Sequence, residues 1–138
     1  MSQAGLVLDA SLALSWALPD EASVYSDAVL AQVAASRALV PGLWPHEMAN
    51  GLVMAQKRGR YTMAQRMVFV EELLRLPIEV ETPGVRDILD GQAALAERYG
   101  LTAYDAAYLD LALRRGMPLA TQDKAMKAAA GKAGAKLV

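Results

Sequence analysis

LTAYDAAYLDLALRRG, residues 101–116, has the pattern of an amphipathic helix with a signal at each end. Thr102 is a suitable N-cap, Asp105 stands three residues later in the reciprocal position of a capping box, and Gly116 follows a basic last turn. The pattern therefore predicts that Asp105 lies in the first turn of a helix. A carboxylate in that position gains about 0.3–1 kcal/mol from the helix dipole, so helix stability alone is enough to explain it.

Three other acidic residues, Asp9, Glu47 and Asp123, stand in the same kind of place as Asp105. Each comes shortly after an apolar, strand-like run and at or near the start of a predicted helix. Taken one at a time, each is best interpreted as an acid that caps its own helix. The four together indicate a shared site only if the fold brings them to one place, so the order of the elements decides between the two interpretations.

Apolar, strand-like runs alternate with helical patterns along the chain. The predicted strands are residues 5–9, 38–41, 78–81, 117–121 and 135–138. The predicted helices are residues 11–18, 20–36, 45–57, 62–76, 85–99 and 101–116, with a short one that begins at Asp123. The first run is apolar throughout rather than alternating, which is typical of a strand buried on both faces. This order predicts an α/β protein, a three-layer α/β/α sandwich with a mainly parallel central sheet.

The length and composition favour one ordinary domain. A chain of 138 residues is long enough for one full core and too short for two, so residues 1–138 are predicted to form a single domain. No apolar run approaches the roughly 18 residues that a membrane span requires, and no membrane contact is expected. The start of the chain lacks the cationic region and long apolar core of a signal peptide, so we expect a cytoplasmic protein.

Residue usage excludes several kinds of site. The absence of cysteine excludes disulfides and thiolate metal sites, and the single histidine, His46, leaves too few nitrogen ligands for an ordinary zinc site. The formal charge of −1 excludes a global basic field, so a nucleic-acid partner would have to be met by local patches. Any metal ion must therefore be held by oxygen atoms.

The predicted topology would bring the four acids together. In a parallel sheet with right-handed crossovers, the carboxyl ends of the strands and the starts of the following helices meet at one edge. Asp9, Glu47, Asp105 and Asp123 all stand at such positions, and four carboxylates at close range repel one another unless a cation is present. An oxygen-only ligand set suits Mg²⁺ or Mn²⁺. A bound metal ion that activates water and offsets charge on a phosphodiester implies phosphodiester hydrolysis.

Two hydroxyls and a basic turn add to this prediction. Ser11 and Thr121 each lie two residues from one of the acids, where they could orient carboxylates or waters. The turn at residues 57–60 could contact RNA phosphates, although cations at a helix end followed by glycine are also an ordinary helix stop. Its basic residues are Lys57, Arg58 and Arg60.

Four short segments resemble the motifs of PIN-domain proteins of the VapC type, the toxin half of a bacterial or archaeal toxin–antitoxin pair. They are VLDAS at 7–11, PHEMAN at 45–50, TAYDAAY at 102–108 and LATQD at 119–123. Each motif is short, but the four occur in the family's order, and the resemblance covers the whole chain.

The resemblance implies a Mg²⁺- or Mn²⁺-dependent endoribonuclease, usually a homodimer, that a cognate antitoxin protein holds inactive. By position, the family's acidic quartet is matched by Asp9, Glu47, Asp105 and Asp123. The small hydroxyl positions near the quartet are matched by Ser11 and Thr121. Asn50, three residues after Glu47, matches a polar position often seen there.

Other classes of phosphate chemistry fit the sequence poorly. A receiver-like phosphoacceptor domain would need an aspartate at the end of a central strand and a lysine after a late one. A haloacid-dehalogenase-like phosphatase would need a second aspartate two residues after Asp9, where Ser11 stands instead. The sequence contains no glycine-rich loop followed by Lys-Ser or Lys-Thr, so it does not predict a phosphate-binding loop. The alternative to the enzyme is a catalytically silent PIN-fold protein that acts through protein or RNA binding.

Overall fold

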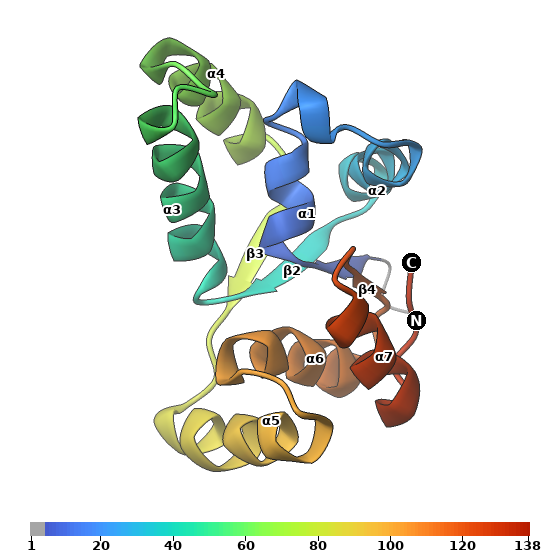
Figure 1. Cartoon of the computed structure of the whole chain (residues 1–138). Coiled ribbons are helices and arrows are strands. Elements are labelled where there is room, and N and C mark those ends of the chain that lie inside the picture. Colours follow the sequence, from blue (N-terminus) through green and yellow to red (C-terminus); the bar gives the residue numbers. More distant parts are fainter. Residues whose placement is uncertain (1–4) are drawn as a thin grey trace.

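A parallel four-stranded sheet runs through the centre of the computed structural model, which describes residues 5–138 (Figure 1). The strand order is β3-β2-β1-β4, and each neighbouring pair is parallel. The strands are β1 (Leu6–Leu8), β2 (Ala38–Pro41), β3 (Ile78–Glu81) and β4 (Leu119–Ala120). Non-consecutive neighbours such as β1 and β4 require crossovers through helices, so the parallel α/β topology predicted from the sequence is confirmed.

Helices lie on both sides of this sheet and give three layers. Figure 1 shows α1 to α4 on one side and α5 to α7 on the other. The first group is α1 (Ala10–Ser15), α2 (Val24–Ala35), α3 (Trp44–Lys57) and α4 (Met63–Leu74). The second group is α5 (Ala93–Tyr99), α6 (Ala103–Arg115) and α7 (Lys124–Ala133). None of the described helices is long and apolar enough to span a membrane.

The core follows from the apolar pattern of the strands. Every residue of β1 and β2 is buried, because helices cover both faces of these two central strands. β3 lies at the edge of the sheet, and its two central residues are exposed between partly buried ends. α6 packs against β1 and β2, and its buried face includes Ala106, Leu109 and Leu111. The helix that carries Asp105 is thus fixed directly against the central strands.

Three of the predicted elements have a different form in the structure. The helix predicted for residues 20–36 is divided into a 3₁₀ turn, η1 (Pro19–Glu21), and α2, because Ser23 and Ser26 form a reciprocal capping box that starts a new helix. The helix predicted for residues 85–99 covers those residues, but its segment η2 (Asp87–Gln92) is π-helical. The strand predicted at the end of the chain is reduced to one bridge between Leu119 and Leu137.

Candidate active site

Asp9 stands where β1 ends and α1 begins, and only 7% of its surface is exposed. It occupies the N-cap position of α1, yet within the described chain its side chain makes no capping hydrogen bond. Its Oδ2 accepts hydrogen bonds from Ser11 Oγ and from Thr121 Oγ1, each at 2.8 Å. Because Thr121 follows β4, this second bond ties the ends of two neighbouring strands together.

Asp123 repeats the arrangement at the start of α7. It is the N-cap residue, and its carboxylate also makes no capping bond in the part of the chain that the structure describes. Its backbone N–H donates to Thr121 Oγ1 at 3.1 Å, so the Thr121 hydroxyl connects Asp9 with the Asp123 backbone. Aspartate is among the strongest capping residues, and neither Asp9 nor Asp123 is used in that way. Helix capping therefore does not explain these two acids.

Glu47 lies in the first turn of α3 and is held by a tyrosine from the opposite layer. The Tyr108 hydroxyl, on α6, donates to Glu47 Oε1 at 2.5 Å. Burial raises the pKa of Tyr108, so the phenol keeps its proton and acts as a donor. Burial also raises the pKa of Glu47, and the charges of Asp9 and Asp105 raise it further against the opposing effect of the Tyr108 bond.

Asp105 lies in the first turn of α6, as predicted. Its backbone N–H donates to Thr102 Oγ1 at 3.1 Å, and the Thr102 hydroxyl also interacts with the Asp105 carboxylate. The described residues thus form one half of the predicted capping box, without the reciprocal bond from the carboxylate to the backbone. Burial raises the pKa of Asp105, and the charges of Asp123 and Asp9 raise it further.

These interactions join the four acids into one electrostatic group. Asp9 acts on both Glu47 and Asp105, and Asp123 acts on Asp105. Within residues 5–138, however, no three histidine, aspartate or glutamate side chains are gathered closely enough to hold a metal ion between them. Magnesium is commonly held by only one or two carboxylates, with water and substrate phosphate as its other ligands. The carboxylate donors present here suit a site of that kind.

The remaining residues singled out in the sequence lie around this group or away from it. Asn50 and His46 line a pocket with Glu47 at the start of α3. Arg60 pairs with Asp20 at 2.9 Å and with Glu21 at 2.8 Å, so its guanidinium is already engaged. Lys57 and Arg58 are exposed at the other end of α3.

Comparison with known proteins agrees with this arrangement. The family model for the PIN domain matches residues 6–132. The chain belongs to the PIN-domain family. Ribonuclease VapC3 of Pyrobaculum aerophilum is 31% identical over 119 residues, which cover 86% of this chain and 89% of that protein. This PIN-domain chain is thus a relative of the VapC-type ribonucleases, and the family resemblance seen in the sequence is confirmed.

The fold of this PIN domain also matches a solved structure. The crystal structure of PAE2754 from Pyrobaculum aerophilum superposes with a TM-score of 0.69 over 92% of this chain and 80% of that chain. The sequence identity is 24%, so this similarity concerns the fold alone. The three-layer α/β/α architecture predicted from the sequence is therefore confirmed.

Two tyrosines of the PIN domain, one bonded to Glu47 and one bonded to Thr121, were not among the predicted site residues. Tyr108 holds Glu47, and its position three residues after Asp105 on one helix is the signal that could have indicated it. The Tyr25 hydroxyl donates to the backbone oxygen of Thr121 at 3.4 Å. No local pattern in the sequence connects Tyr25 with Thr121, because the two residues are 96 positions apart.

Replacing Tyr108 with phenylalanine is expected to destabilise this PIN domain. The variant removes a buried donor and leaves the Glu47 carboxylate half-buried without it, which costs about 1–3 kcal/mol. Urea unfolding followed by circular dichroism measures the change. Tyr99→Phe is the matched control, because no described hydrogen bond uses the Tyr99 hydroxyl. Equal stability of Tyr108→Phe and the native protein would show that the bond to Glu47 contributes nothing to the fold.

Proposed function

We propose that this chain is an endoribonuclease that hydrolyses RNA phosphodiester bonds with the help of Mg²⁺ or Mn²⁺. The observation that carries the proposal is the behaviour of Asp9 and Asp123. Both occupy N-cap positions without capping, and both contribute charge that raises the pKa of a neighbouring acid. Carboxylates that repel one another at the edge of the sheet are stabilised by a bound cation, so their presence there favours a metal site.

The proposed ligands of that cation are Asp9, Glu47, Asp105 and Asp123, directly or through water. When bound, a divalent metal ion lowers the pKa of its water and offsets charge on the phosphodiester. The chain's own hydrogen bonds fix the donor oxygens beforehand. Ser11 and Thr121 hold Oδ2 of Asp9, and Tyr108 holds Oε1 of Glu47. Such supporting bonds keep ligands in place without the need to reorganise them.

RNA is the proposed substrate because the curated relative is a ribonuclease by name. Lys57 and Arg58 are proposed to contact phosphates of the same strand. Lys57 lies ten residues after Glu47 along α3, about 15 Å away, which corresponds to a few nucleotides. Arg60 is included in this contact only if RNA competes successfully with its ion pairs to η1.

The proposed biological setting follows from the VapC family. The chain would act as a single domain in the cytoplasm, as the toxin of a toxin–antitoxin pair, and as a homodimer that a cognate antitoxin holds inactive. Asn50 is proposed to support the site from the same helix as Glu47, because residues three apart on a helix lie on one face.

Cleavage of end-labelled total RNA by purified, partner-free protein tests the nuclease proposal. Discrete fragments are expected with Mg²⁺ or Mn²⁺ and not with EDTA, and an Asp105→Asn variant should not produce them. Folding of each sample is checked by circular dichroism. If the folded native protein cuts no RNA under any of these conditions, or if Asp105→Asn cuts as well as the native protein, the proposal is wrong. In the first case a silent binding protein with the PIN fold takes its place.

A further inference from the structure

A pocket of about 310 Å³ adjoins the acidic group and is not explained by metal binding. It is lined by Leu43, His46, Glu47, Asn50 and Tyr104. Glu47 belongs both to this pocket and to the acidic group, so a molecule that lies in the pocket is next to the proposed cleavage site. Leu43, His46 and Tyr104 have no part in holding the acids.

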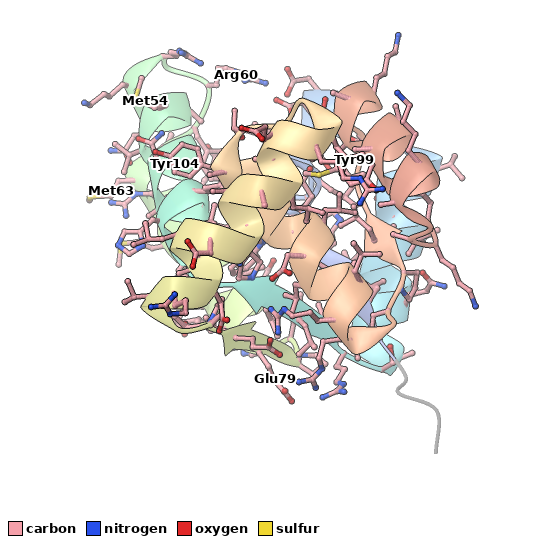
Figure 2. All side chains as sticks on the ribbon, turned by 90° about the horizontal axis from the view of Figure 1, so that it is seen from below. Met54, Arg60, Met63, Glu79, Tyr99 and Tyr104 are labelled. Atoms are coloured by element: carbon pink, nitrogen blue, oxygen red, sulfur yellow. The ribbon has the colours of Figure 1, made fainter. Side chains whose placement is uncertain are left out.

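Tyr104 is the unusual member of this lining. It is 68% exposed, and among the described residues it is the only Phe, Trp or Tyr side chain that is not at least partly buried. In Figure 2 it lies beside the green ribbon of α3, on the flank of the molecule that also carries Met54 and Met63. A large ring left in solvent beside a pocket that contains a few polar groups offers a face on which another flat ring can stack.

A second pocket, of about 380 Å³, lies next to the first and shares Leu43 and Tyr104 with it. Its lining is mostly apolar and includes Pro41, Pro83 and Ile88. The Tyr104 side chain therefore takes part in two adjoining hollows, of which one borders Glu47 and the other borders the loop after β3. This arrangement provides room for flat groups beside the tyrosine.

The polar groups in the first pocket favour an uncharged, hydrogen-bonding ligand. The Glu47 carboxylate repels a phosphate, whereas it does not repel a neutral nucleobase. The Asn50 amide both donates and accepts, and the His46 ring can also bond to the edge of a base. Single-stranded RNA is recognised by this combination of an aromatic platform and side chains that bond to the edge of an unpaired base.

We propose that Tyr104 and the first turns of α3 form a binding subsite for one unpaired nucleobase of the RNA, next to the phosphodiester that is cut. The inference rests on the proposed ribonuclease function and adds a substrate class to it. The base stacks on Tyr104, and Asn50 and His46 bond to its edge. A base in a duplex is not available for this contact, so the substrate is a single strand or a loop.

RNA binding in EDTA tests the subsite without relying on cleavage. The probe is a short fluorescent single-stranded RNA, chosen because the native protein binds it in EDTA, and fluorescence anisotropy gives its Kd. Loss of one base stack in Tyr104→Ala is expected to weaken binding roughly 5- to 150-fold. Tyr104→Phe keeps the ring and should bind within about twofold of the native protein. Leu89→Ala is the matched control, because Leu89 is 69% exposed and lines neither pocket.

A series of RNAs, each with one abasic position, identifies the contacted base. At one position next to the cleaved bond, removal of the base should weaken binding to the native protein as much as Tyr104→Ala does. Removal of the same base should have little further effect on the variant, because the two changes delete one interaction. A duplex of the same sequence should bind equally to the native protein and to Tyr104→Ala.

The results separate this inference from the nuclease proposal. Cleavage that needs metal, together with a Tyr104→Ala variant that binds and cuts as the native protein does, would refute the subsite and leave the nuclease standing. Binding that depends on Tyr104 without any cleavage would support the subsite and refute the nuclease. A variant unchanged towards RNA but weakened in self-association or in antitoxin binding would also refute the subsite, because a protein would then be the occupant of this surface.

Discussion

Replacement of Asp9 with asparagine is expected to lower the rate of RNA cleavage by about 10²- to 10³-fold. Asp9 is the acid that acts electrostatically on both Glu47 and Asp105, and it is the most buried of the three. The loss of its charge weakens the hold on a cation that is worth several kcal/mol to the transition state, and each 1.4 kcal/mol is about tenfold in rate. Asparagine has the same shape, so this effect is chemical and not one of packing.

Single-turnover cleavage of labelled RNA, at a Mn²⁺ concentration no higher than the native protein's Kd for the metal, measures this effect. Asp110→Asn is the matched control, since Asp110 lies on α6 but bonds to Gln92 and Arg114 instead of the acidic group. The control variant should cut at close to the native rate. The assignment of Asp9 would be wrong if Asp9→Asn, shown to be folded, cut RNA within a few-fold of the native protein.

The surroundings of Asp9 also show which features of the fold could be predicted from the sequence alone. The run before Asp9 predicted a buried strand, and this prediction is confirmed by the complete burial of Leu6–Leu8. The N-cap at Thr102 was also predictable, because capping depends on residues three apart. These local signals were enough to predict that acids stand at strand ends and helix starts. Parallel topology then predicted that such positions lie at one edge of the sheet.

The side-chain contacts within the site could not be predicted in this way. The bond from Tyr108 to Glu47 joins residues 61 positions apart, and it requires α6 to pack against β1 and β2 in one particular register. The Thr121–Asp9 bond joins residues 112 positions apart and depends on the pairing of β1 with β4. The sequence indicated that Ser11 and Thr121 could orient a carboxylate, but it did not indicate that both would bond to the same oxygen.

The wrongly predicted ends of two elements also have a physical cause. The helix predicted for residues 20–36 depended on Tyr25, Val29 and Val33, which all lie within α2, and it overlooked the Ser23–Ser26 capping box that starts this helix. At the end of the chain, the apolar Leu137 predicted a strand, but only one bridge to Leu119 forms. Periodicity predicts which residues are buried more reliably than it predicts where an element begins, because two short-range hydrogen bonds are enough to move a helix start.

The metal-free protein is expected to lose stability as the pH rises above about 4, through the raised pKa values of Glu47 and Asp105. Both groups bind protons more tightly in the folded state than in the unfolded chain, because burial and neighbouring acids disfavour their charged forms. The unfolded chain therefore loses these protons first. Across this window the folded state keeps protons that the unfolded state has released, so the free energy of unfolding falls as pH increases.

A divalent cation should reverse this loss at neutral pH, because it binds the charged form of the folded site. At a Mn²⁺ concentration about a hundred times the Kd, the expected stabilisation is about 2.7 kcal/mol, or several degrees in Tm. Thermal unfolding from pH 4 to pH 8, in EDTA and in Mn²⁺, measures both effects. Asp105→Asn should be more stable than the native protein in EDTA at pH 7, since it removes a repelling charge, and it should gain less from Mn²⁺.

The combination of these results separates a metal site from a structural acid. Asp27→Asn is the control, because Asp27 is exposed in the first turn of α2 and its replacement should leave the response to Mn²⁺ unchanged. If Asp105 served only its helix, Asp105→Asn would lower the Tm in EDTA, because the favourable charge at the start of α6 would be lost. A gain in EDTA together with a reduced response to Mn²⁺ is the result that only a repelling, cation-binding group of acids produces.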